Sequence, residues 1–90
     1  VPQDVGPTGV SAAALASLRA SVEADGLSPE GGAYPEGVRV VNEETWRRRF
    51  YADAGTDVKV DTLKKRFQRA LRDLLAEGHA KQVGLWFWPT

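Results

Sequence analysis

Apolar residues recur at helical spacing in three parts of this 90-residue chain. In the first part, Leu15, Leu18 and Val22 stand at i, i+3 and i+7, so they line one side of a helix. Ser11 is a suitable N-cap, and a glycine directly follows Asp25. The pattern therefore predicts a helix that is capped by Ser11 and runs to about Asp25.

The second and third parts predict two further helices. Trp46 and Phe50 fall on one side of a helix that we expect to begin after an N-cap at Asn42 and to end near Ala54. A longer stripe predicts a helix over residues 61–77, with Asp61 as its cap. The apolar positions of this longest helix are Leu63, Phe67, Ala70, Leu71, Leu74 and Leu75.

Short runs of β-branched and aromatic residues predict three strands. We expect a brief strand at residues 38–41. Residues 80–83 and 85–88 should then pair as a hairpin with a tight turn at Val83-Gly84. The chain therefore closes on a small antiparallel unit.

The remaining segments are rich in glycine and proline. Residues 26–37 hold four Gly and two Pro, which predicts a loop, and residues 1–10 are interpreted as a lead-in or linker. The resulting order is helix, strand, helix, helix, strand, strand. This order is typical of a winged helix-turn-helix, an α+β fold with three helices and a small antiparallel sheet or hairpin wing. We therefore expect a single winged-helix domain over residues 11–90.

The apolar stripes of three helices have only one another and a small sheet to cover them, so we expect one core. Side chains alternate across a strand, which puts Trp86 and Trp88 on one face and Phe87 on the other. Packing of these aromatics in the core, or against missing parts of the protein, is favoured over stacking on bases. The expected core consists of Leu15, Leu18, Val22, Val40, Trp46, Phe50, Leu63, Phe67, Leu71, Leu74 and Trp86.

Charge is segregated along the chain, although the formal net charge is zero. Residues 1–38 carry a net charge of −4, whereas residues 39–81 carry +4. At about 100° per residue, the third helix should present basic and amide side chains opposite its apolar stripe. These side chains are Lys65, Gln68, Arg69 and Arg72, with Lys64 on one flank.

Basic residues over two helices are the electrostatic pattern of a nucleic-acid binder. In the major groove of double-stranded DNA, Arg can clasp guanine and Gln can clasp adenine. Phosphates would be held from other elements by Arg48, Arg49, Lys59 and Lys81. The alternative is a solvated face, in which Arg69 pairs with Asp73 at i, i+4. For Arg47, the corresponding alternative is packing over an aromatic ring or pairing with an acid.

The sequence contains no recognisable set of catalytic residues. Cysteine is absent, His79 is the single histidine, and Gly31-Gly32 lacks the Lys-Ser/Thr of a phosphate-binding loop. We therefore expect no enzyme activity, metal or cofactor in this chain.

No apolar run reaches the roughly 20 residues that span a bilayer. No secretory signal precedes the domain, so we expect a cytoplasmic protein without membrane contact.

Three short segments carry a family signal. They are residues 41–47 (Val-Asn-Glu-Glu-Thr-Trp-Arg), 65–71 (Lys-Arg-Phe-Gln-Arg-Ala-Leu) and 85–88 (Leu-Trp-Phe-Trp). The chain resembles, over residues 11–88, the C-terminal region of RecA-fold replicative helicases and ATPases of plasmids and prophages. In that family a Trp-Arg element opens a helix, and a short hairpin ending in Trp closes the chain.

The resemblance implies a bacterial winged-helix appendage that follows an ATPase core and acts in DNA replication. It implies structural roles for Trp46, Phe67 and Trp86, while Arg47 and Arg69 match positions to which it assigns no role. The first residue is Val rather than Met, which we interpret as the mark of a fragment from such a larger protein.

Two functions therefore remain open. The first is a module that binds double-stranded DNA. The second is a winged helix that docks its own ATPase core or a replication partner through the first helix and the aromatic tail. In this second case the basic residues would serve solubility.

Overall fold

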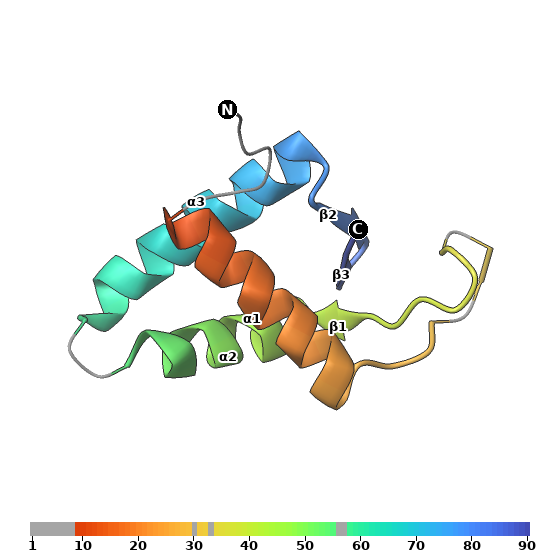
Figure 1. Ribbon diagram of the computed structural model, residues 1–90, viewed down its shortest axis with the longest axis horizontal. Coiled ribbons are helices and arrows are strands. Elements are labelled where there is room, and N and C mark those ends of the chain that lie inside the picture. The colour runs from red at the N-terminus through yellow and green to blue at the C-terminus, as the bar shows by residue number, and fades with distance from the viewer. Residues whose placement is uncertain (1–8, 30, 33, 56–57) are drawn as a thin grey trace, which may run out of the picture.

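The computed structural model describes residues 9–29, 31–32, 34–55 and 58–90. Three helices and a three-stranded antiparallel sheet follow one another in the predicted order, so the α+β class is confirmed (Figure 1). The helices are α1 (Gly9–Asp25), α2 (Glu43–Ala54) and α3 (Val60–Glu77). The strands are β1 (Val41–Asn42), β2 (Ala80–Val83) and β3 (Trp86–Pro89), and β3 lies between the other two.

The N-terminal ends of the helices follow the predicted capping only in α2. There the Asn42 side chain accepts a hydrogen bond of 2.8 Å from the backbone N–H of Thr45, as expected. The cap predicted at Ser11 is wrong, because α1 already begins at Gly9. The cap predicted at Asp61 is also wrong: Lys59 occupies that position, and Asp61 lies in the first turn, where its charge complements the helix dipole.

The chain turns back on itself directly after α1. The Arg39 guanidinium donates to the carbonyl oxygens of Glu23 (3.4 Å) and Gly26 (3.1 Å). It thus supplies hydrogen-bond donors to carbonyl groups at the C-terminal end of α1. Gly26 lies so close to α1 and to Arg39 that a Cβ at this position would clash with the backbone. Leu27 and Val40 then exchange both backbone hydrogen bonds, at 2.8 and 2.9 Å. The strand predicted at residues 38–41 is thus reduced to this bridge and the short β1.

The core surrounds Trp46, whose side chain is completely buried. Its ring lies 5.0 Å from that of Phe67 on α3 and 5.3 Å from that of Phe87 on β3, both measured between centroids. Its indole N–H donates to the carbonyl oxygen of Ala14 on α1 at 2.9 Å. Most predicted core residues are buried, but Val22 and Leu71 lie only partly buried at the edge of the core.

The hairpin has a different register from the predicted one. Its turn falls at residues 84–85, and β3 covers residues 86–89 instead of 85–88. Trp86 pairs with Asn42 and is only partly buried, whereas Phe87 is 2% exposed and faces the helices. The placement of Trp86 in the core is therefore wrong. The alternation itself is as predicted, but the opposite face of the strand packs on Trp46.

The described residues of the segment 26–37 form a loop, as predicted, and Tyr34 of this loop packs on the sheet. The Tyr34 ring lies 5.4 Å from that of Trp88, which is only 6% exposed. Phe87 points to the helices, so Trp88 and Tyr34 lie on the outer face of the sheet. In Figure 1 this loop extends beyond β1, away from α3. None of the described helices is both long and apolar enough to span a membrane.

Replacing Phe67 tests the position of α3 in the core. Its ring is fully buried against Trp46 and lies 5.5 Å from that of Phe50, so Phe67→Ala leaves a cavity at the meeting point of two helices. We expect a loss of about 3–5 kcal/mol in unfolding free energy, measured by denaturant titration. Val60→Ala, at a position 65% exposed on the same helix, should cost no more than about 0.5 kcal/mol. Equal losses in the two variants would contradict the helix orientation.

Candidate nucleic-acid interface

The side of α3 that points away from the core carries a dense set of charges. Leu63, Phe67 and Leu74 are buried on the opposite side of the helix. Six exposed residues together line an open hollow along the outer side, which we call the α3 face. They are Asp61, Lys64, Lys65, Gln68, Arg69 and Arg72. All five residues predicted from the helical periodicity are thus brought together on one surface.

The four cations of the α3 face are not neutralised by neighbouring acids within the described part of the chain. Arg69 and Asp73 form no ion pair there, so the alternative pairing considered for Arg69 is absent. Asp73 is not part of the α3 face; it lines a neighbouring hollow with Val10 and Ser11 of α1, and Arg69 borders both hollows. The α3 face therefore keeps an excess of positive charge, with Asp61 as the one acid in its lining.

One edge of the α3 face is joined to the start of α2. Glu43 accepts from Arg47 within α2 and from Gln68 of α3, each at 3.5 Å and through the same carboxylate oxygen. Arg47 thus pairs with an acid, which was the alternative considered for it. Glu43 was not among the predicted site residues; its spacing from Arg47, i to i+4, is the sequence signal that indicates this pair.

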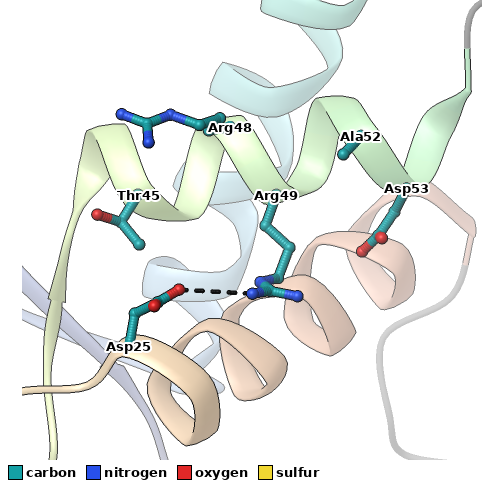
Figure 2. Close-up of a pocket in the computed structure, with 6 residues that line it drawn as sticks. All are labelled: Asp25, Thr45, Arg48, Arg49, Ala52 and Asp53. Atoms are coloured by element: carbon teal, nitrogen blue, oxygen red, sulfur yellow. Dashed lines mark hydrogen bonds and ion pairs between the residues drawn. The ribbon is translucent and has the colours of Figure 1, made fainter.

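The two arginines of α2 that were expected to hold phosphates differ in their surroundings. Figure 2 shows Arg49 reaching from α2 to Asp25 on α1, while Arg48 points away from α1. Arg49 donates to Asp25 at 3.4 Å, and its Nε is buried without a partner in the described residues. Arg48, whose side chain is 74% exposed, pairs with Glu44 at 2.9 Å.

Arg49 is therefore turned toward α1, although the expected phosphate contact requires it to point outward. The physical reason is that α1 packs against this side of α2, where Ser17 also donates to Asp53 at 2.9 Å. The helical period of α2 alone does not reveal which polar side faces another helix. Arg49 connects α2 to Asp25 of α1 and is committed to that contact.

The other two expected phosphate contacts lie in different places. Lys59 is exposed at the N-cap of α3, directly before the α3 face begins. Lys81 is exposed on β2 but stands opposite Trp88, on the outer face of the sheet. There it lines a hollow together with Tyr34 and Glu36. Lys59 thus directly precedes α3 in the chain, whereas Lys81 and Arg49 lie apart from the α3 face.

Comparisons of this chain with protein-family models, curated proteins and solved structures give no significant match. Among the described residues there is no group of three or more His, Cys, Asp or Glu side chains that could hold a metal ion. The geometry and charge of the α3 face therefore carry the argument about function.

A double-mutant cycle on Asp25 and Arg49 measures how firmly α1 is held on α2. Because this pair is partly shielded between two helices, we expect a coupling of about 0.5–1 kcal/mol in unfolding free energy. The Glu44–Arg48 pair, which is exposed and lies within one helix, serves as the matched control and should couple by less than about 0.5 kcal/mol. A larger coupling for the control pair would contradict the structural role of Arg49.

Proposed function

We propose that this domain is a winged helix-turn-helix module that binds double-stranded DNA and places α3 in the major groove. The observation that carries the proposal is the α3 face: four cations and a glutamine line one open surface opposite the buried side of the same helix. The major groove admits an α-helix, and Arg, Lys and Gln are suited to read base edges there.

The arrangement of elements supports this proposal. In a helix-turn-helix, the second of two consecutive helices lies in the groove and the first crosses the backbone. Here α2 and α3 are consecutive and in contact, α1 packs on both, and the β2–β3 hairpin follows α3 directly. In the sheet order β1-β3-β2 this hairpin lies beside β1, an arrangement that is compatible with a wing.

The exposed residues divide into two proposed roles. Lys65, Arg69 and Arg72 meet base edges, together with Gln68, because they lie on the outer side of α3. Lys59 at the N-cap of α3, Lys64 on α3 and the exposed Arg48 on α2 hold phosphates. For Arg48, exchange of Glu44 for a phosphate costs little, since exposed ion pairs contribute about 1 kcal/mol or less.

The alternative of a protein-docking module has less support from the same structure. It requires the aromatic tail at the surface, but Phe87 and Trp88 are both buried within the domain. A role as the C-terminal domain of a replication or mobile-element ATPase is part of our proposal and rests on the sequence resemblance alone.

The salt dependence of binding tests the electrostatic part of the proposal. Each neutralised phosphate releases counterions and contributes a slope of about −0.9 to log affinity against log salt. With three phosphate contacts we expect a slope of about −3 for a labelled random duplex, titrated between about 50 and 200 mM salt. Absence of duplex binding at the lowest salt would sink the proposal for this domain.

A pair of double variants locates the interface on the molecule. Arg69→Gln with Arg72→Gln should weaken duplex binding by at least about 30-fold, since each Arg contact to guanine is worth about 1–3 kcal/mol. Arg19→Gln with Lys81→Gln removes the same charge from exposed positions on α1 and on the outer face of the sheet. This control should change the affinity by no more than about threefold through net charge alone. Equal losses would show that only the total charge matters.

A further inference from the structure

The outermost stripe of α3 begins with an acid. Four residues recur at i, i+4, i+7 and i+11, on the side of the helix directly opposite the apolar stripe. They are Asp61, Lys65, Gln68 and Arg72. At 1.5 Å per residue the stripe extends about 16 Å along the helix axis. Asp61 is its first member and lies in the first turn of α3.

Asp61 differs from the other acid that lies near this surface. Glu43 is held by both Arg47 and Gln68, so its carboxylate is occupied within the domain. Asp61 is exposed, and it forms no ion pair with Lys64 or Lys65 although these stand at i+3 and i+4. Its carboxylate therefore faces whatever approaches the α3 face.

We infer that Asp61 determines sequence specificity by accepting a hydrogen bond from the N4 amino group of a cytosine in the major groove. This inference rests on the proposed function. In a helix-turn-helix, the N-terminal residues of the second helix are those that contact base edges, which is the position of Asp61.

The chemistry of the four bases singles out cytosine. An ionised carboxylate only accepts hydrogen bonds. Guanine presents the acceptors N7 and O6 in the major groove, and thymine presents O4 and a methyl group. Adenine has a donor at N6, but its acceptor N7 lies beside it, whereas cytosine presents the N4 amino donor alone. A carboxylate on this face is thus satisfied at cytosine and meets acceptors at the other bases.

The same carboxylate also rejects incorrect sites. Against guanine or thymine it loses water without gaining a donor, and at adenine the acceptor N7 lies beside the one donor. At each of these bases it also remains close to the phosphates that the neighbouring cations attract. Specificity is a difference between affinities, and such an unpaired charge lowers the affinity of the incorrect sites. Asp61 therefore lowers affinity for random DNA and raises selectivity.

Selection from a duplex library with randomised central base pairs tests the role of Asp61. The parent chain should enrich duplexes with cytosine at one fixed position, on the order of tenfold over the other bases. Asp61→Asn removes the charge but keeps the size of the side chain, and it should bring the cytosine preference at that position close to parity. The preferences at the positions read by Lys65, Gln68 and Arg72 should persist.

Asp73→Asn is the matched control, because Asp73 is an exposed acid on the same helix but lies outside the α3 face. It should leave the cytosine preference intact, and thermal melts of both variants check that the fold is retained. If the parent chain binds DNA with a salt-dependent affinity but shows no cytosine preference, or if Asp61→Asn only tightens binding to all sequences, the inference is overturned while the proposed function stands. Absence of duplex binding by the parent chain would overturn both.

Discussion

The packing of Trp46 is the interaction on which the rest of this structure depends. One side chain contacts every other layer of the domain: its indole N–H reaches the Ala14 carbonyl on α1, and its ring meets Phe67 on α3 and Phe87 on β3. In a domain of 90 residues the core is small, so one fully buried aromatic of this size contributes a large share of its stability. The Trp46–Phe67 contact also fixes the rotation of α3 about its axis, and hence the direction of the α3 face.

Polar contacts, in addition to the aromatic core, hold the helices together. The α1–α2 interface includes the Ser17–Asp53 hydrogen bond and the Asp25–Arg49 ion pair. Ion pairs within the domain neutralise the three arginines of α2. Arg49 pairs with Asp25 in the acidic half of the chain, while Arg47 and Arg48 pair with glutamates one helical turn earlier. The cations on α3 form no such pairs within the described residues. The positive charge that is available to a partner is therefore concentrated on this one helix.

The features that depend on local sequence could be predicted from the sequence. The three helices follow from the apolar spacing, and the Asn42 cap and the glycine at the end of α3 follow from backbone hydrogen bonding within a single turn. The α3 face could be predicted for the same reason, since its residues share one helix and a large apolar stripe fixes its outward side. The N-cap of α3 was predicted two residues too late, at Asp61, because Lys59 occupies the cap position without a side-chain hydrogen bond.

The features that depend on tertiary packing could not be predicted. Alternation in β3 gives two equivalent faces, and only the approach of Trp46 selects Phe87 for the core. The orientations of Arg49 and Lys81 depend likewise on which side of α2 meets α1 and on which face of the sheet Tyr34 covers. The glycine and proline content of the loop after α1 gives no sign that its Tyr34 shields Trp88.

An NMR titration of the isotopically labelled chain with a short duplex tests most directly whether the α3 face is the interface. Backbone and side-chain amide signals report each residue separately, so the method locates binding without any substitution. We expect the largest shifts at Lys65, Gln68 and Arg72, with Tyr34 and Trp88 unaffected on the outer face of the sheet. Shifts centred on the outer face of the sheet, with α3 unchanged, would contradict the central claim.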